Sequence, residues 1–589
     1  MKKILLFLFF SLALSSIIFG QSGWKTKLAP KVLTEYVEDN ELDLIVVFKD
    51  KADVSVAKYL STKSAKGRYV YEALKATTQS SQKNVMAWAA YHHYKTKSFY
   101  ITNALQIKIP AASLEQLASF VEVKYISNNG LLRYHEPVEK YPALLRGNEG
   151  KEWGIDTINA NDVWALGYTG QGVVVGGEDT GYDWKHPAIQ PKYRGWDGTT
   201  ADHNYNWHDA IHELNPLNGD STSNPLNNPC GLDSPEPCDD GSHGTHTMGT
   251  MVGSTPGDTI GVAPDARWIG VRNMERGWGK PSTYIEGFEW FLAPTDLNNQ
   301  NPDPDKSPDV INNSWGCPPN EGCDLSNFGV MQDVVANLKA AGIVVVVSAG
   351  NAGSGCGSID DPAAIFEESF SIGATRSNDT IANFSSRGGV SIDGSFRTKP
   401  NVSAPGVGVR SCTPGGNYQF FSGTSMAGPH VAGAVALILS AAPELKGQVD
   451  VIEDILEQTA IPKYTDQACD SIPGSIVPNN TYGYGRIDVL QAVKLALKTV
   501  AANDIEKPKT TVTSFPNPVS NTLYFDVKEF NGDILIEIFD VPGKLIYSSK
   551  QQVAGDKLVK CDFQHESTGL YFYKITGQQL CVAGKFVKN

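Results

Sequence analysis

The 589-residue chain contains no segment rich in lysine and arginine, and its formal net charge is −14. An acidic chain without a basic cluster is poorly suited to a phosphate backbone, so we expect no nucleic-acid partner. No two cysteines are separated by only two residues, which argues against a common type of zinc site. No convincing glycine-rich phosphate loop or dinucleotide fingerprint occurs, so nothing in the sequence indicates a bound nucleotide.

Long apolar runs are equally scarce. One such run follows Met1-Lys-Lys, ends at Phe19 and precedes Gly20-Gln21. It predicts a signal peptide over residues 1–20 with cleavage near Gly20, and a retained anchor is the alternative. No other segment reads as long enough to span a bilayer. We therefore expect an exported chain without a stable membrane span.

Nine cysteines are few for this length, but in an exported chain they indicate disulfides, with one thiol left over. The candidate pairs, taken from positions along the chain, are Cys230 with Cys238, Cys317 with Cys323, Cys356 with Cys412 or Cys469, and Cys561 with Cys581.

The most informative feature that is present is the run Phe421-Ser-Gly-Thr-Ser-Met-Ala-Gly-Pro-His-Val431. It places Ser425 where a glycine-rich turn leads into an apolar helix over residues 431–439. The first N–H groups of a helix lack intrahelical partners, and the positive end of the helix dipole favours negative charge. This environment suits a nucleophilic serine beside which an oxyanion forms. A capped helix without a catalytic role is the alternative.

Two further segments supply an acid and a base. Val173-Val-Val-Gly-Gly-Glu-Asp-Thr-Gly181 predicts a buried strand that ends in a turn, so Asp179 lies at the carboxyl edge of a sheet, where open α/β folds place catalytic groups. His243-Gly-Thr-His-Thr-Met-Gly-Thr-Met-Val-Gly253 begins a helix, with His243 just inside its start. His246 is the competing base, but we expect it to pack or to form hydrogen bonds.

With Asp179, His243 and Ser425 in this order, the chain resembles the subtilisin family of serine peptidases over roughly residues 150–497. Asn313-Ser-Trp-Gly316 and Ser348-Ala-Gly-Asn351 belong to the same resemblance. It implies an α/β fold with a parallel sheet flanked by helices, and a Ser-His-Asp triad that acts through an acyl-enzyme.

The resemblance also implies roles for residues outside the triad. Asn351 is the implied oxyanion-hole donor, together with the backbone N–H of Ser425. The resemblance also favours Cys469 as the partner of Cys356. The family often has threonine where this chain has Gly428. The residues implied in binding an extended substrate are Ser314, Trp315, Gly316, Ala349 and Gly350.

Specificity and metals are less defined. The loop Gly357–Pro362 is expected to line the pocket for the residue before the cleaved bond, where Asp360 or Asp361 would favour a basic side chain. The chemistry requires no cofactor. Structural calcium is common in the family, and the stretch Asn301–Asp309 permits a site without specifying its ligands.

Residues 21–140 are predicted to form a separate α+β unit, with strands over 42–48, 104–110 and 121–126 and helical stretches over 80–93 and 113–120. This order resembles the prodomain of the family, an inhibitor and folding aid whose tail occupies the cleft until it is cut between about residues 128 and 151. An unrelated small domain is the alternative.

The peptidase domain is placed at residues 141–500 and a linker at 501–511. Residues 512–589 predict a small all-β sandwich, with strands over 523–527, 534–539, 569–573 and 584–588 and a turn over 541–544. Phe515-Pro-Asn-Pro518 and the terminal Lys-Phe-Val-Lys resemble a type IX secretion sorting domain. That resemblance implies the type IX machinery as a partner and export through the periplasm, with release or attachment at the cell surface. A carbohydrate- or protein-binding domain is the alternative.

The sequence therefore predicts a secreted serine endopeptidase that acts on proteins and peptides and processes its own precursor, with its own prodomain as a partner. Two other functions are weighed against it. One is a non-catalytic binding or adhesion protein on the same scaffold, and the other is a specialised processing peptidase.

Overall fold

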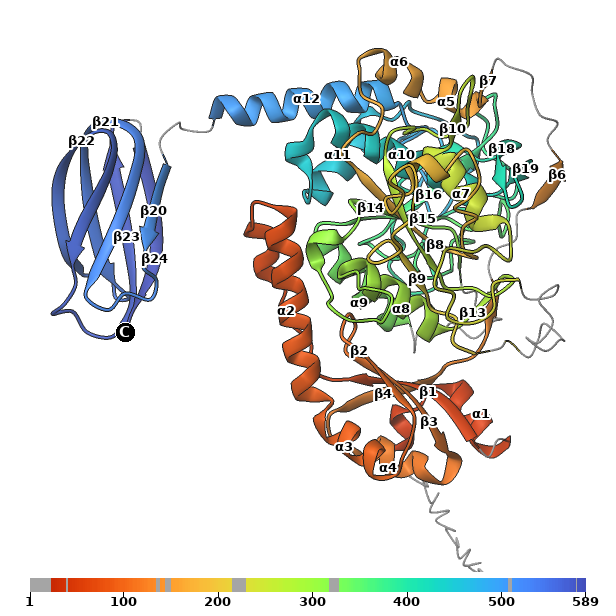
Figure 1. The fold of residues 1–589 in the computed structure, drawn as a ribbon, viewed down its shortest axis with the longest axis horizontal. Coiled ribbons are helices and arrows are strands. Elements are labelled where there is room, and N and C mark those ends of the chain that lie inside the picture. Colours follow the sequence, from red (N-terminus) through yellow and green to blue (C-terminus); the bar gives the residue numbers. More distant parts are fainter. Residues whose placement is uncertain are drawn as a thin grey trace, which may run out of the picture. The chain divides into compact units, whose positions relative to one another are not determined.

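The computed structural model describes residues 23–38, 41–133, 138–142, 150–213, 215, 229–316, 328–506, 511–578 and 580–589. The chain divides into two compact units, Met1–Leu497 and Lys498–Asn589, and each is described by itself. The larger unit contains an N-terminal region, residues 24–133, and a domain built on a parallel sheet (Figure 1).

The N-terminal region has an antiparallel sheet in the order β2-β3-β1-β4. Its strands and helices are β1 (Glu41–Phe48), β2 (Thr96–Phe99), β3 (Ala104–Pro110), β4 (Val123–Asn128), α1 (Pro30–Glu38), α2 (Lys63–Ser81), α3 (Lys83–Tyr91) and α4 (Leu114–Ser119). The helix predicted over 80–93 corresponds to α3, and the longer α2, which was not predicted, precedes it. Thr62 caps α2 by accepting the backbone N–H of Ala65 at 3.1 Å, and this fixes the start.

Seven parallel strands form the central sheet of the large domain, in the order β17-β16-β15-β14-β8-β12-β9. Later strands are added on both sides of β8, so β8 lies where the strand order reverses, and ligands bind at such a point in open α/β sheets. The strands are β8 (Val174–Asp179), β9 (Trp207–Asp209), β12 (Arg267–Arg272), β14 (Val310–Asn313), β15 (Val344–Ser348), β16 (Phe370–Thr375) and β17 (Val402–Pro405).

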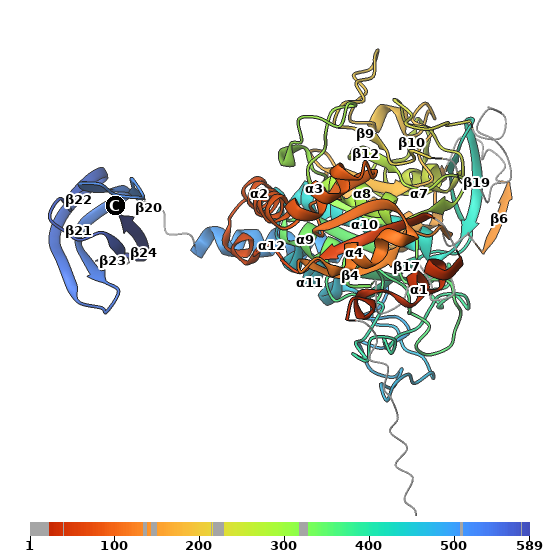
Figure 2. The ribbon, with the colours of Figure 1, turned by 90° about the horizontal axis from the view of Figure 1, so that it is seen from below.

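Helices cover both faces of this sheet (Figures 1 and 2). The helices α7 (His243–Val252) and α10 (Thr424–Ala441) pack on one face, and α8 (Pro281–Leu292) and α9 (Phe328–Ala340) pack on the other. A Cβ on Gly176 would meet Phe291 of α8 at 2.9 Å, whereas one on Gly177 would meet Met248 of α7 at 3.5 Å. Successive residues of β8 therefore point to opposite faces, as the pleat requires.

Shorter elements complete the larger unit. They are α5 (Trp153–Thr157), α6 (Ala160–Ala165), α11 (Val449–Thr459), β5 (Leu132–Arg133), β6 (Glu139–Pro142), β7 (Gly150–Lys151), β10 (Ser254–Thr255), β11 (Asp258–Thr259), β13 (Trp278–Gly279), β18 (Val409–Thr413) and β19 (Asn417–Ser422). The last helix, α12, spans Val489–Glu506.

The C-terminal unit includes the end of α12, and its described residues after that helix are all-β. Its strands are β20 (Thr511–Phe515), β21 (Thr522–Asp540), β22 (Leu545–Asp562), β23 (Gly569–Gly577) and β24 (Leu580–Lys588). The predicted strands 523–527 and 534–539 are two halves of β21, whose register shifts between Val527 and Phe530. Both halves contribute to one core, for example through Phe525 and Ile536.

Two of the candidate disulfides are present, Cys230–Cys238 and Cys356–Cys469. Cys412, the other candidate partner of Cys356, is a buried free thiol. The candidate pair at residues 317 and 323 lies outside the described residues.

The candidate pair of Cys561 and Cys581 is wrong, because both are free thiols. Cys561 on β22 points into the core of the C-terminal unit, whereas Cys581 on β24 is exposed. Alternate residues of a strand face opposite sides of a sheet, so the outward position of Cys581 keeps the two sulfur atoms on different faces.

Among the described residues one helix, α10, has the length and mean hydropathy of a membrane span, and 94% of that window is buried within the protein. A helix that is apolar on all sides is typical of the core of a large domain. This helix is not apparent as a long apolar run because Gly428, Pro429 and His430 interrupt it. The predicted signal peptide, residues 1–20, lies outside the described residues.

Candidate active site

Asp179, the last residue of β8, and His243, the first residue of α7, form a hydrogen-bonded pair. Both carboxylate oxygens of Asp179 lie 2.8 Å from His243 Nδ1, and Oδ1 also accepts the backbone N–H of Thr180 at 2.7 Å. A Cβ on Gly244 would meet the Gly181 carbonyl oxygen at 2.1 Å, so glycine is needed where α7 begins this close to β8. A carboxylate at Nδ1 keeps the ring proton there and leaves Nε2 as the basic nitrogen.

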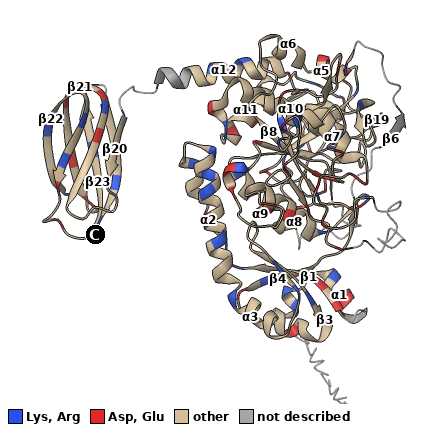
Figure 3. Cartoon of the chain, viewed as in Figure 1, with Lys and Arg blue, Asp and Glu red and all other residues tan. Residues whose placement is uncertain are grey.

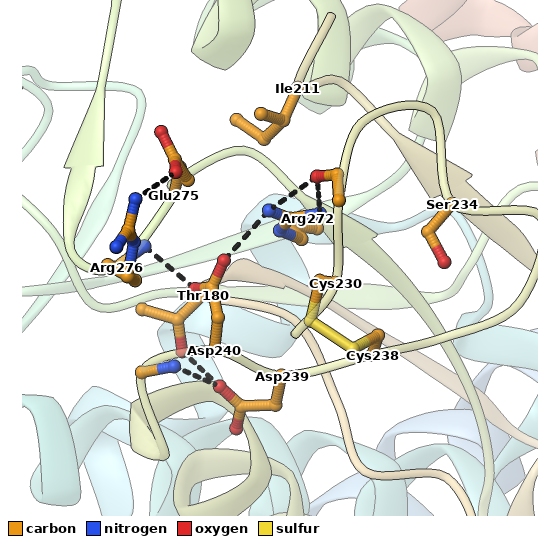
Figure 4. Close-up of polar contacts among 12 residues, drawn as sticks. Thr180, Ile211, Cys230, Ser234, Cys238, Asp239, Asp240, Arg272, Glu275 and Arg276 are labelled. Atoms are coloured by element: carbon orange, nitrogen blue, oxygen red, sulfur yellow. Dashed lines mark hydrogen bonds and ion pairs between the residues drawn. A yellow bond between two sulfur atoms is a disulfide. The ribbon is translucent and has the colours of Figure 1, made fainter. Parts of the chain in front are cut away.

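The start of α7 is held by Asp239 (Figure 4). Its Oδ1 accepts the Thr180 hydroxyl and the backbone N–H groups of Gly241 and Ser242, each at 2.8 Å. Its Oδ2 accepts the backbone N–H of Thr245 at 3.0 Å and the Thr245 hydroxyl at 2.5 Å. One carboxylate thus joins the residue that follows Asp179 to the turn that carries His243.

A buried ion network includes the next residue, Asp240 (Figure 4). The guanidinium of Arg272 donates to Asp209 at 3.0 Å, to Asp240 at 2.8 Å and to the Gly231 carbonyl oxygen at 3.1 and 3.2 Å. Burial raises the pKa of Asp240 to about 6 despite the adjacent guanidinium. Gly231 follows the first cysteine of the Cys230–Cys238 disulfide, so the network ties this loop to the sheet.

Ser425 lies in the first turn of α10, which begins at Thr424. Its side chain is fully buried, and its Oγ donates to the Ser314 carbonyl oxygen at 3.4 Å. A backbone N–H at this position has no intrahelical acceptor. The structure therefore places Ser425 in the helix rather than ahead of it, and its backbone nitrogen remains a suitable donor for an anion.

The amide of Asn351 borders the same space as Ser425. A Cβ on Gly423, if there were one, would lie 3.4 Å from Asn351 Nδ2 and 3.7 Å from Ser425 N. Asn351 Oδ1 accepts the backbone N–H and the hydroxyl of Thr424, both at 2.9 Å. Two nitrogen donors, one of them the backbone nitrogen of Ser425, therefore border one small volume at Gly423.

The residues implied in substrate binding follow neighbouring parallel strands. Ser314, Trp315 and Gly316 come directly after β14, and Ala349 and Gly350 come directly after β15. Parallel strands end at a common edge of the sheet, so both segments lie at the edge where β8 presents Asp179. Ser314 Oγ also donates to the Ser425 carbonyl oxygen at 3.3 Å, which joins this edge to α10.

His246 has structural partners. Its Nε2 lies 3.1 Å from the Val409 carbonyl oxygen and 3.2 Å from that of Gln419, and its ring stacks on Phe421 with a centroid distance of 4.2 Å. Burial lowers the pKa of His246 to about 3, so the ring is neutral at ordinary pH. This geometry agrees with the expected packing role.

Two other predicted positions have clear surroundings. Asp361 is buried, and a Cβ on Gly350 would lie 3.7 Å from its Oδ2, so this carboxyl group is near the predicted binding segment. Its preference for a basic substrate remains a prediction. Gly428, which departs from the family pattern, has no room for a side chain, because a Cβ there would lie 2.8 Å from Asn312 Oδ1.

Sequence reasoning did not single out Asp239. A signal was available, because Asp239-Asp240-Gly241-Ser242 immediately precedes the helix start. Short side-chain oxygens before a helix accept its first N–H groups. The sequence does not reveal that the same carboxylate also reaches Thr180, 59 residues earlier in the chain.

Comparisons with known proteins identify the family. The subtilase family matches residues 170–485, which is more than half of the chain. The chain belongs to the subtilase family. Subtilases are serine endopeptidases, and they need no cofactor for catalysis. The secretion system C-terminal sorting domain matches residues 513–589, which indicates a protein that is secreted or attached to the cell surface.

Individual relatives cover the chain to different extents. Bacillopeptidase F of Bacillus subtilis (strain 168) is 36% identical over 502 residues, which cover 80% of this chain and 32% of that protein. Subtilisin amylosacchariticus of Bacillus subtilis subsp. amylosacchariticus is 31% identical over 367 residues, which cover 62% of this chain and 77% of the relative. The chain thus spans about a third of the first relative and most of the second.

Carboxylates in the Asp-rich stretch predicted to permit calcium have other partners. Asp305 binds Arg68, and Asp309 lies 3.2 Å from Lys63 and 3.0 Å from Lys446. In the part of the chain that the structure describes, no three His, Cys, Asp or Glu side chains converge as a metal site.

Proposed function

We propose that the protein hydrolyses peptide bonds through Ser425, His243 and Asp179. Ser425 Oγ attacks the scissile carbonyl carbon while His243 Nε2 accepts its proton and later protonates the leaving amine. Asp179 keeps the other ring proton on Nδ1 and stabilises the imidazolium. Asn351 Nδ2 and the Ser425 N–H stabilise the oxyanion. Water then cleaves the acyl-enzyme by the same proton transfers.

The observation that carries this proposal is the buried Asp179–His243 bond at the sheet edge where two donors border one volume beside Ser425. A binding or adhesion protein has no use for a buried carboxylate–imidazole pair, which is costly to desolvate. These groups therefore favour catalysis over the non-catalytic alternative.

Covalent labelling with a fluorophosphonate tests the proposal. We expect the processed protein to be labelled on Ser425, and we expect Ser425→Ala and His243→Ala to lose the label. A folded, processed protein that is not labelled would support the adhesion alternative. Cleavage profiling with a diverse peptide library separates a general endopeptidase from a specialised one, which would cut only a few related sequences.

We further propose that residues 21–140 act as the prodomain. The supporting contacts join the N-terminal region to α8 and α9. Glu289 of α8 accepts the backbone N–H groups of Tyr100 at 2.5 Å and Ile101 at 2.9 Å, and the Thr102 hydroxyl donates to the Val330 carbonyl oxygen at 3.0 Å. Buried side chains of both parts also form one apolar cluster.

Charge supports the same assignment. Basic residues are spread along α2 (Figure 3), and cations of the N-terminal region meet carboxylates of the peptidase domain. Lys51 lies 2.7 Å from Asp333, and Arg68 binds Asp305. An inhibitory unit needs such complementary charges to stay bound after its peptide bond is cut.

The segment after β4 favours a particular cleavage region. β5 pairs antiparallel with β13, and β6 pairs antiparallel with β19, which leads through Gly423 to Ser425. Figure 2 shows β6 beside β19. Because paired segments lie on both sides, we place self-cleavage between Arg133 and Val138, a few residues before the predicted boundary at 140.

Processing is tested with the full chain. We expect Ser425→Ala to accumulate with residues 24–133 still attached, and the amino terminus of the active enzyme to fall within residues 134–138. Normal processing of Ser425→Ala would mean that another peptidase makes the cut, whereas an amino terminus elsewhere would reject the position alone.

We propose that residues 512–589 direct export through the periplasm by a type IX secretion system. Deletion of this domain is expected to abolish appearance of the peptidase in the medium or on the cell surface while leaving it detectable inside the cell. Undiminished secretion would favour a binding role for the domain. Structural calcium is proposed without assigned ligands, and a fall in Tm on chelation would support it.

A further inference from the structure

Glu178, the residue before Asp179, has a role that the triad does not explain. The pleat of β8 turns the two carboxyl groups to opposite faces, so Asp179 meets His243 of α7 and Glu178 points toward α8. Glu178 is fully buried, and its Oε1 accepts the indole N–H of Trp315 at 3.0 Å. Its Oε2 has no hydrogen-bond partner among the described residues.

Trp315 links this carboxyl group to the predicted substrate-binding segment. Its side chain is 2% exposed and stacks on Tyr284 of α8, with ring centroids 4.1 Å apart. The preceding residue, Ser314, exchanges two hydrogen bonds with Ser425, one through each residue's hydroxyl. The segment is therefore fixed to the nucleophile on one side and to β8 through the indole on the other.

The surroundings accommodate this acid specifically. A Cβ on Gly287 of α8 would lie only 2.4 Å from Glu178 Oε2, so the helix has a glycine where the carboxyl group needs room. A buried carboxyl with an unpaired oxygen destabilises a fold, and an apolar side chain would fill the site without that penalty. The arrangement is thus better explained by what the carboxyl group holds than by packing.

We propose that Glu178 is a positioning residue for substrate binding. It fixes the Trp315 indole and thereby fixes the position of the Ser314–Gly316 backbone relative to an extended substrate. The inference rests on the proposed function and on the predicted role of this backbone as an edge that pairs with the extended substrate. A shift of about 1 Å in such a segment is enough to cost a large factor in rate.

Glutamine is the conservative replacement for this position. Burial raises the pKa of the Glu178 carboxyl group well above its ordinary range, although the indole N–H opposes the change, and this direction favours the neutral form of the group. The side-chain carbonyl of Glu178→Gln can accept the same indole N–H, whereas Glu178→Met keeps the length and removes the acceptor. Trp315→Phe removes the indole N–H that donates to Glu178, so it breaks the same hydrogen bond from the donor side.

A matched control is available in the same core. Trp290 of α8 is 4% exposed, and its indole nitrogen has no hydrogen-bond partner among the described residues. Trp290→Phe therefore makes the same change of side chain as Trp315→Phe without removing an indole hydrogen bond. All variants are made as full chains, allowed to process, and compared per titrated active site.

The test compares substrates that differ in how much of the Ser314–Gly316 segment they contact. Peptides with four residues before the cleaved bond span the Ser314–Gly316 segment, whereas a single-residue ester and a fluorophosphonate engage chiefly Ser425. We expect Glu178→Met and Trp315→Phe to lose at least tenfold in kcat/KM on the four-residue peptide, mainly through KM, and less than threefold on the ester and in labelling rate. Glu178→Gln and Trp290→Phe should stay within about twofold of wild type on both.

The double variant Glu178→Met/Trp315→Phe should be no worse than either single variant, because the two changes break the same bond. Equal losses on peptide and ester, or a full loss in Glu178→Gln, would overturn the proposal and leave Glu178 a structural residue. If Glu178→Met does not mature, Trp315→Phe and Glu178→Gln still decide the question. Failure of wild type to react with the fluorophosphonate would instead reject the proposed function.

Discussion

At the scale of single residues, the amide of Asn351 has an orientation that its neighbours fix. Its Oδ1 accepts a backbone N–H and a hydroxyl from Thr424, and a backbone N–H can only donate. Nδ2 must therefore be the atom that faces Ser425, and it is buried without a partner among the described residues. An unpaired buried donor costs roughly 1–3 kcal/mol. Such a cost is understandable where a transition state supplies the missing acceptor.

Replacement of Asn351 should therefore act on turnover rather than on binding. We expect Asn351→Ala to lower kcat by about a hundredfold or more, equivalent to roughly 3–4 kcal/mol, the magnitude established for this donor in subtilisin, a member of the same family. Asn351→Asp keeps the acceptor for Thr424 but removes the donor, so it should be at least as impaired. The measurement is kcat per titrated active site, with Tm as the control for folding. Unchanged turnover in both variants would remove Asn351 from the site.

At the scale of elements, the catalytic geometry depends on how α7 begins. Its first residue, His243, follows Ser242, whose φ of 67° is left-handed and whose side chain makes no cap. Asp239 supplies the cap instead and also binds the hydroxyl of Thr180. The strand that ends in Asp179 and the helix that starts at His243 are therefore joined by one carboxylate, in addition to the bond between the side chains of Asp179 and His243.

Loss of this cap should damage both stability and catalysis. Asp239→Ala leaves several buried donors unpaired, at about 1–3 kcal/mol for each. A resulting displacement of His243 should lower kcat between about tenfold and a hundredfold. Asp197→Ala is the matched control, because Asp197 caps an exposed loop in the same manner through Thr199 and Thr200. A loss of stability without any loss of kcat would show that Asp239 does not position the histidine.

The same elements show what the sequence could predict. Asp179 ends a buried strand, and Ser314 and Ala349 each follow one, so their meeting at one sheet edge follows from the general rule for parallel sheets. The bonds of Asp239 to Thr180 and of Glu178 to Trp315 could not be predicted, because these partners lie 59 and 137 residues away in the chain. The continuity of β21 was also hidden, since the polar pair Lys528-Glu529 interrupts its alternation where the register shifts.

At the scale of the whole molecule, the N-terminal region and the peptidase domain share a protonation equilibrium. Glu289 of α8 is half-buried and hydrogen-bonded to the N-terminal region, and its desolvation raises its pKa to about 8, although the N–H groups of Ile101 and Tyr100 favour the charged form. Once the N-terminal region leaves, water reaches the carboxyl group and its pKa returns toward the ordinary value. At a pH between the ordinary pKa and the raised pKa, dissociation of the N-terminal region therefore releases a proton from Glu289.

The sign of this linkage predicts how pH would control the inhibition that we propose for the N-terminal region. A carboxyl group whose pKa is raised in the complex makes the complex strongest below its ordinary pKa of about 4.5 and progressively weaker up to about 8. We expect the affinity of the cleaved N-terminal region for the fluorophosphonate-blocked enzyme to fall between pH 5 and pH 8. Glu289→Gln should flatten this dependence, because the amide still accepts N–H bonds but does not titrate. Glu115→Gln, an exposed change on α4, should retain it. An equally steep fall in Glu289→Gln would assign the proton to another group.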